Sequence, residues 1–175
     1  MTTIYEKLEL AHETQVNKLS SRSITLIISL LMATVVSGCF SKDPPPTPAT
    51  IINAEVLASD FINPDGEGRP SPIVVRLYEL KNLSTFNTTE FFPLYNEEAA
   101  TLGDDLVYRE EFSLVPGGKK LYTRTPAADT QYLAVIAAFR SIDQATWKAA
   151  VPIPAERVTN LIIQLDSLSV SIRAE

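Results

Sequence analysis

The chain has 175 residues, a formal net charge of −6, one histidine and one cysteine. An acidic chain without a Lys/Arg cluster lacks the electrostatic signature of a nucleic-acid-binding protein, so we expect no nucleic acid as a partner. The only histidine, His12, lies near the N-terminus, so residues 39–175 lack histidine-based catalysis and Cys/His metal binding; we expect no enzyme, no cofactor and no small-molecule substrate.

A lipidation signal ends at Cys39. An uncharged apolar run at residues 24–36 follows Arg22 and leads into Val36-Ser37-Gly38-Cys39. The run is shorter than the roughly 20 residues of a membrane-spanning helix, and it matches a signal-peptide core of about 7–15 residues. Small residues before a cysteine are typical of the lipobox of bacterial lipoproteins. We therefore predict a signal peptide at residues 1–38 and a covalent lipid on Cys39; the alternative is a short anchor helix with a buried structural cysteine.

The chemistry of lipidation explains why a cysteine stands at this position. Its thiolate is a good nucleophile and can take a diacylglyceryl group as a thioether. Cleavage before Cys39 frees an amine for a further acyl chain, and several chains are needed because one chain binds a membrane only marginally. The residue after Cys39 is Phe40 and not aspartate. By resemblance to enterobacterial sorting, the absence of aspartate at this position favours the outer membrane. Residues 1–21 are longer than a typical basic leader, which favours a start further downstream, and we assign them no function.

A proline-rich tether is predicted between the lipid and the folded domain. Residues 40–49 contain four prolines, which favour polyproline II at about 3.1 Å per residue and a reach of roughly 30 Å. We therefore expect the lipidated cysteine and tether at residues 39–49 and one domain at residues 50–175. No cysteine remains for a disulfide, so this domain depends on an ordinary hydrophobic core.

Period-two alternation from Thr50 onward predicts short strands. They are expected at residues 51–58, 72–81, 106–115, 119–125, 131–140, 146–151, 158–166 and 168–173. Residues 131–140 are apolar on both faces, as in a central strand, and Pro116-Gly117-Gly118 predicts a hairpin between the third and fourth strands. Eight strands at this spacing predict a mainly all-β fold, an antiparallel β-sandwich.

Residues 83–103 have helical spacing and predict one or two short helices inserted after the second strand. Ser84 and either Thr88 or Thr89 are candidate N-caps, and Gly103 is a candidate helix end. The segment also carries an aromatic cluster, which we expect to pack on the open sheet face and not to line a ligand pocket: Phe86, Phe91, Phe92 and Tyr95.

The loop at residues 63–71, between the first two strands, is longer than a hairpin connection needs, and such loops often carry function. Its alternating oxygen-bearing residues resemble an EF-hand, but Val74 stands where a bidentate glutamate is required, so we predict a turn and not a calcium site. Three adjacent carboxylate pairs diverge on a strand or helix and are predicted to be solvated surface charge: Glu97-Glu98, Asp104-Asp105 and Glu110-Glu111.

A further set of segments resembles a known family and covers nearly the whole of the expected domain. They are Asn63-Pro64-Asp65, residues 68–72, residues 75–80, Phe86, Glu90-Phe91, residues 102–106, Phe112, Pro116-Gly117, residues 132–140, Ile142-Asp143 and Trp147. Together with the lipobox and tether, they resemble the TssJ (SciN-type) outer-membrane lipoproteins of type VI secretion systems.

This resemblance implies a transthyretin-like sandwich of two four-stranded sheets with an extra helical element. It implies a structural role, anchoring the periplasmic domain of TssM, and through it TssL, at the outer membrane. The family's loop between the first two strands is most associated with TssM binding, which implies these partner-binding residues: Asn63, Asp65, Gly66, Glu67, Gly68, Arg69 and Pro70. Arg69 is the expected anchor; the alternative is that it only braces its own loop.

Two other functions stay open. Some transthyretin-like proteins hydrolyse 5-hydroxyisourate with histidines and arginine, and the lack of histidine in residues 39–175 argues against this. A periplasmic lipoprotein with a small-ligand or carbohydrate-binding module would use the aromatic insert. If successive strands all reverse direction, the loops after the first, third, fifth and seventh strands meet at one end, and we expect the partner to dock there.

Overall fold

Alternating burial along the strands builds the predicted sandwich. The computed structural model describes residues 47–175; the predicted signal peptide, Cys39 and most of the tether lie outside the described residues. In β1 (Ile51–Ala58), the even-numbered residues are buried and the odd-numbered ones are partly exposed, as expected for a strand with one face on a core.

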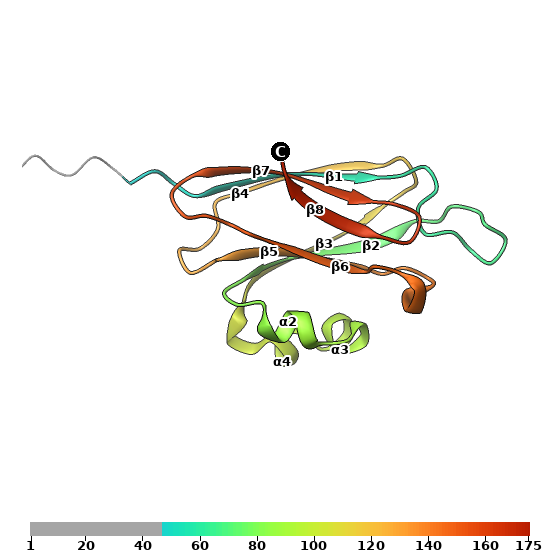
Figure 1. The fold of residues 1–175 in the computed structure, drawn as a ribbon, viewed down its shortest axis with the longest axis horizontal. Helices are drawn as coiled ribbons and strands as arrows, with labels where there is room; N and C mark the ends of the chain where they lie inside the picture. Colours follow the sequence, from blue (N-terminus) through green and yellow to red (C-terminus); the bar gives the residue numbers. More distant parts are fainter. Residues whose placement is uncertain (1–46) are drawn as a thin grey trace, which may run out of the picture. The chain divides into compact units, whose positions relative to one another are not determined.

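The strands form two four-stranded sheets (Figure 1). The remaining strands are β2 (Ile73–Leu80), β3 (Leu106–Leu114), β4 (Lys119–Arg124), β5 (Tyr132–Ala137), β6 (Lys148–Pro152), β7 (Val158–Leu165) and β8 (Val170–Ala174). One sheet has the order β4-β1-β7-β8 and the other the order β3-β2-β5-β6. The predicted β-sandwich of eight strands is confirmed.

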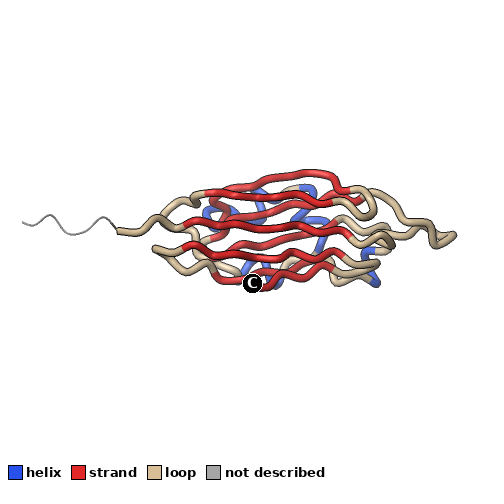
Figure 2. The backbone as a smooth tube through the Cα atoms, turned by 90° about the horizontal axis from the view of Figure 1, so that it is seen from above, coloured by secondary structure: helices blue, strands red, loops and turns tan. Residues whose placement is uncertain are grey.

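One strand pair departs from the antiparallel pattern. β1 and β7 pair in parallel, with Ala54 opposite Leu161, while the five other pairs are antiparallel. Successive strands alternate in direction, so two odd-numbered strands that become neighbours must run the same way. The backbone tube in Figure 2 shows the strands aligned along one direction, with the loops gathered at the two ends.

The predicted hairpin between β3 and β4 is wrong. These strands lie at the edges of different sheets, and β4 pairs with β1. The turn itself forms as predicted: Gly117 has a positive φ of 69°, and Gly118 N–H donates to the Val115 carbonyl at 2.9 Å. However, Gly117 N–H donates to the carbonyl of Ser59, beyond the end of β1. The turn therefore connects two strands of different sheets. The residues of the turn alone do not show whether the strands on either side of it pair as a hairpin.

The strand β5 lies between two cores. Its residues Leu133 and Val135 face the sandwich interior, while Ala134 and Ile136 face a second core beneath the helical insert. All four are at most 1% exposed. The prediction of a central strand that is apolar on both faces is confirmed.

The helical insert covers the outer face of the β3-β2-β5-β6 sheet (Figure 1). It contains the helices α2 (Ser84–Thr88), α3 (Phe91–Asn96) and α4 (Glu98–Leu102), followed by a 3-10 turn at Gly103–Asp105. Three helices form where one or two were expected. Gly103 ends α4 with a φ of 52°, as predicted.

The predicted N-caps are wrong. Leu83 and Glu90 occupy the N-cap positions of α2 and α3, and neither makes a side-chain cap hydrogen bond. Ser84 is already helical, and its N–H donates to the side chain of Asn82 at 2.8 Å. The Thr88 hydroxyl instead donates to the Ser84 carbonyl at 3.0 Å, at the end of α2. Hydroxyl residues thus bond back along the short helix instead of beginning a new one.

Candidate docking site at the distal end of the sandwich

The loops after the odd-numbered strands meet at one end, which we call the distal end because it lies opposite Thr50, where the chain enters β1. These loops span residues 59–72, 115–118, 138–147 and 166–169. Backbone hydrogen bonds join them: Ser59 accepts from Gly117 at 3.2 Å, and Ser167 accepts from Asn63 at 3.0 Å. The predicted gathering of these loops is confirmed, and the loop of residues 59–72 protrudes farthest (Figures 1 and 2).

Asn63 holds the base of the protruding loop. Its side chain donates to the Pro72 carbonyl at 2.8 Å and accepts from the backbone N–H of Arg140 at 2.8 Å. Its φ of 49° lies in the left-handed region, which asparagine tolerates better than most residues. Only 3% of Asn63 is exposed. It therefore fixes the loop on the sandwich, and its own polar atoms are used inside the protein.

Residues 65–69 form a compact, prefolded turn centred on Asp65. The Asp65 carboxylate accepts from the backbone N–H groups of Glu67 at 2.9 Å and Arg69 at 3.0 Å. Gly68 has a φ of 80° and donates its N–H to the Asp65 carbonyl at 2.9 Å. The backbone and side-chain hydrogen bonds from Arg69 lower the pKa of Asp65, and burial partly opposes them. The turn is therefore ordered before any partner arrives.

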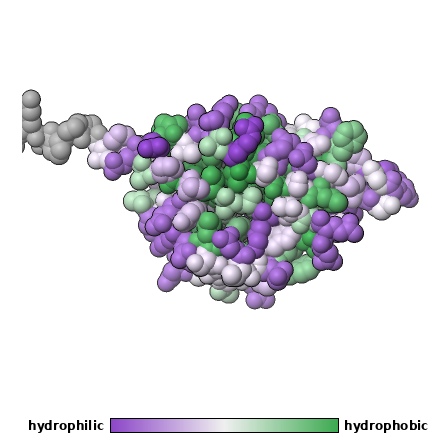
Figure 3. Space-filling view, viewed as in Figure 1, coloured by the Kyte–Doolittle hydropathy of each residue, from purple (hydrophilic) through white to green (hydrophobic). Residues whose placement is uncertain are grey.

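Arg69 forms ion pairs within its own loop, and the alternative that it does nothing else stays a prediction. Its Nε lies 2.8 Å from Asp65 Oδ2, and its Nη1 lies 3.1 Å from Glu67 Oε2. Yet 70% of its side chain remains exposed, as does 73% of that of Glu67. Gly66, Gly68 and Pro70 are also exposed, and the protruding tip is hydrophilic in Figure 3. The predicted partner-binding residues other than Asn63 therefore form a continuous accessible surface.

Two exposed apolar residues at the distal end were missed from the sequence. Phe61 is 72% exposed and Val115 is 60% exposed, among the most exposed large apolar residues of the described chain. They lie on neighbouring loops, because Gly117 N–H bonds to Ser59. The sequence did contain a signal for Phe61: this phenylalanine lies in a turn-rich segment, where no predicted strand or helix would bury it. Contiguous exposed apolar surface rimmed by polar residues is typical of interaction sites.

Two of the adjacent carboxylate pairs are not simple surface charge. Glu98 bridges Arg76 at 2.8 Å and Arg109 at 2.6 Å, and only 15% of its side chain is exposed. Glu111 contacts the same two arginines, and the hydrogen bond from Arg76 lowers its pKa. This network fastens α4 to β2 and β3. The prediction of solvated charge is wrong for Glu98 because the insert folds back over the sheet.

The aromatic residues of the insert pack mainly as a core. Phe86 and Phe91 are 1% and 8% exposed, and Phe91 stacks on Tyr95 with ring centroids 5.1 Å apart. Phe92 is the exception, with 61% exposed. Within residues 47–175, no group of three or more His, Cys, Asp and Glu side chains is arranged to hold a metal ion. None of the helices described for residues 47–175 is long and apolar enough to cross a membrane.

The fold and the site together define a class of protein: a transthyretin-like β-sandwich with a helical insert on one face and a prefolded loop surface at one end. The model of a family described as "Type VI secretion lipoprotein, VasD, EvfM, TssJ" matches residues 50–168. The chain belongs to this family, which is defined as a lipoprotein component of a secretion system and not by an enzymatic activity.

Solved structures agree with the family. The lipoprotein TssJ1 from Pseudomonas aeruginosa is 35% identical, with a TM-score of 0.71, over 73% of this chain and 98% of TssJ1. Serratia marcescens Lip, described as a membrane-bound component of the type VI secretion system, is 24% identical (TM-score 0.66; 73% and 96% covered). A chain of the structure described as the TssM C-terminal domain from EAEC is 20% identical (TM-score 0.59; 70% and 99% covered) and shows the same fold. No curated protein matches.

Proposed function

We propose that this lipoprotein holds the periplasmic domain of TssM, and through it TssL, at the outer membrane. The observation that carries the proposal is the placement of the loops: they gather at the end of the sandwich opposite Thr50, where the chain arrives from the tether. The tether and the partner would then join the domain at opposite ends. A protein with its two attachment points at opposite ends can link a membrane to a second protein without either contact obstructing the other.

The membrane end of the proposal rests on Cys39. Its thiol takes the diacylglyceryl group, cleavage makes it the N-terminus, and several acyl chains together give a stable anchor. Phe40 at the next position favours the outer membrane. Cys39→Ser should leave an unprocessed precursor that takes up no radiolabelled palmitate, and labelling of this variant at the wild-type level would disprove the assignment.

The partner end of the proposal rests on the surface formed by Asp65, Gly66, Glu67, Gly68, Arg69 and Pro70, with Phe61 and Val115 beside it. The hydrogen bonds around Asp65 hold this surface in one conformation, so docking costs less conformational entropy than it would for a flexible loop. Arg69 and Phe61 are both exposed. Arginine and aromatic side chains are enriched at protein–protein interfaces, where arginine can make several hydrogen bonds and an aromatic ring buries a large apolar area.

The test is binding of the purified TssM periplasmic domain to the detergent-solubilised lipoprotein. Replacing residues 65–69 with a glycine-serine linker should abolish binding while melting temperature and lipidation stay unchanged. The matched control replaces the exposed turn Ala127–Asp129 between β4 and β5, at the opposite end, and should bind normally. Normal binding by the 65–69 variant would remove this loop from the interface, and no binding by the wild type would refute the function.

A further inference from the structure

A groove lies beside the distal end, between α3 and the loop that joins β5 to β6. It has a volume of about 270 Å³ and is lined by Glu90, Phe91, Phe92, Ile142, Asp143, Ala145 and Trp147. The lining residues 142–145 belong to a distal loop, residues 138–147, which Asn63 holds through the Arg140 backbone. The groove therefore continues the distal surface toward the helical insert (Figure 1, where the 3-10 turn of residues 142–144 is orange beside α3).

The floor of the groove is aromatic and rigid. Phe91 meets Trp147 edge to face, with ring centroids 5.3 Å apart, and Phe92 in the same manner at 5.5 Å. Phe91 is buried, and Trp147 packs against both hydrophobic cores. Phe92 is 61% exposed. The groove thus presents an aromatic face to the solvent without needing to rearrange.

The walls of the groove carry unbalanced negative charge. Glu90 and Asp143 are exposed, and neither takes part in an ion pair among residues 47–175. Lys148 interacts electrostatically with Glu90 but does not line the groove. Its ammonium group donates to the carbonyls of Phe86, Asn87 and Thr89 at 2.8–3.0 Å, and it lies 4.7 Å from the centroid of the Trp147 ring.

We propose that this groove receives an arginine or lysine side chain of the protein that docks at the distal end; this inference rests on the proposed function. Two carboxylates over an aromatic floor complement both parts of a basic side chain, its apolar stem and its cationic head. The apolar stem packs on Phe92 and Trp147, and the cationic head lies between Glu90 and Asp143. Charge complementarity of this kind sets register and association rate as well as affinity.

The first experiment measures the affinity of the detergent-solubilised lipoprotein for the TssM periplasmic domain at low and high salt. The double variant Glu90→Gln/Asp143→Asn should weaken binding on the order of tenfold at low salt, and less at high salt. Both substitutions preserve shape, and neither side chain makes a hydrogen bond in residues 47–175, so folding is preserved. The control Glu97→Gln/Asp104→Asn removes two exposed charges from the insert outside the groove and should leave affinity unchanged.

The second experiment tests the floor and identifies the occupant. Phe92→Ala should weaken binding several-fold, whereas Leu121→Ala, which removes an equally exposed apolar side chain from β4, should not. A photoreactive phenylalanine at position 92 should crosslink to a TssM peptide that contains arginine or lysine.

The outcomes separate this inference from the function on which it rests. If the wild type binds TssM and the 65–69 variant does not, while the groove variants bind normally, the groove proposal fails and the function stands. Crosslinking to a second copy of this chain, or to a TssM peptide without a basic residue, also overturns the groove proposal. If the wild type does not bind TssM, both fall.

Discussion

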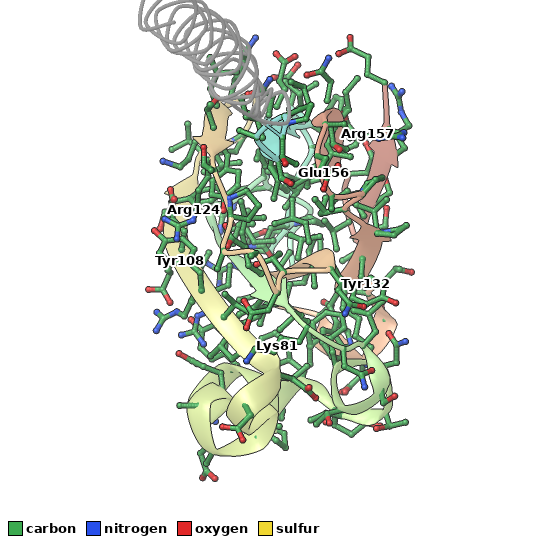
Figure 4. All side chains as sticks on the ribbon, turned by 90° about the vertical axis from the view of Figure 1, so that its left-hand side faces the viewer. Lys81, Tyr108, Arg124, Tyr132, Glu156 and Arg157 are labelled. Carbon is green, nitrogen blue, oxygen red and sulfur yellow. The ribbon has the colours of Figure 1, made fainter. Side chains whose placement is uncertain are left out.

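The Tyr122 hydroxyl donates a 2.8 Å hydrogen bond to the Glu79 carboxylate across the interior between the two sheets. Glu79 lies on β2 and is completely buried, and Arg124 Nε donates to the same oxygen at 2.7 Å. The Arg124 guanidinium in turn lies 3.4 Å above the ring of Tyr108 (Figure 4). Since β2 belongs to one sheet and β4 to the other, these contacts join the sheets on the side where β3 and β4 form no ladder.

Tyr122→Phe should lower the free energy of unfolding by about 1–3 kcal/mol, because it removes a donor from a buried carboxylate whose other oxygen has no partner in the described residues. Urea denaturation at neutral pH measures the change. Tyr108→Phe is the matched control: its hydroxyl makes no hydrogen bond within residues 47–175, and its ring still packs under Arg124. Equal stability of Tyr122→Phe and wild type would contradict the bridge between the sheets.

The same tyrosine predicts an alkaline limit to stability. Burial, and then the hydrogen bond to Glu79, raise the pKa of Tyr122 above its usual value of 10.0. The folded protein therefore holds this proton more tightly than the unfolded chain does. The resulting stabilisation is fully present below pH 10.0 and is lost as the pH rises above it. Between about pH 10 and 11, stability should fall less steeply in Tyr122→Phe than in wild type; parallel curves would assign the loss to other groups.

A side chain at Gly117 should destabilise the protein. Its φ of 69° is left-handed, and an added Cβ would lie 2.5 Å from Asp60 Oδ1. Asp60 is exposed and can move, so the backbone strain dominates, and Gly117→Ala should cost about 1–2 kcal/mol in thermal or urea unfolding. Gly66→Ala, where a Cβ meets nothing within 4 Å, should change stability by less than about 0.5 kcal/mol. Comparable losses in both variants would show that the crossing between sheets is not strained.

The two roles of Arg69 can be separated by removing its partner. Asp65→Asn breaks the brace but leaves the arginine in place, whereas Arg69→Ala removes both brace and side chain. If Arg69 also contacts TssM, Arg69→Ala should weaken binding at least roughly tenfold more than Asp65→Asn. Arg157→Ala, at the opposite end of the sandwich (Figure 4), is the charge-matched control. Equal losses in Asp65→Asn and Arg69→Ala would restrict Arg69 to bracing.

The behaviour of this loop at low pH follows from the lowered pKa of Asp65. A carboxyl group whose pKa is lower in the folded state braces the loop at every pH above its usual value of 3.8. The brace is lost only as the pH falls through the lowered pKa, so the turn at residues 65–69 should stay closed throughout the neutral range.

Local patterns predicted most of the fold. Alternation predicted the eight strands because most of them bury one face, and the doubly apolar residues 131–140 marked a strand between two cores. The gathering of the odd-numbered loops followed from strand direction alone. These features depend on short stretches of sequence or on simple geometry, so the sequence was enough to predict them.

Other features depend on pairing between distant segments. Pro116-Gly117-Gly118 encodes a tight turn, but it does not determine whether β4 pairs with β3 or with β1; in the folded chain, Tyr122 of β4 is buried opposite Ala54 of β1. Glu98 looked like surface charge because Arg76 is distant in sequence. The groove of Glu90 and Asp143 likewise joins segments 53 residues apart, which only the folded chain brings together. The partner-binding role of residues 65–70 stays a prediction.

β1 runs directly from Thr50, where the predicted tether ends, into the protruding distal loop. A pull between the lipid anchor and a partner held at residues 65–70 would therefore pass along the covalent backbone of a single strand that is already extended. Such a strand cannot lengthen much, at about 3.3 Å per residue. The other seven strands lie off this line of force, so tension between membrane and partner need not break the sheets apart.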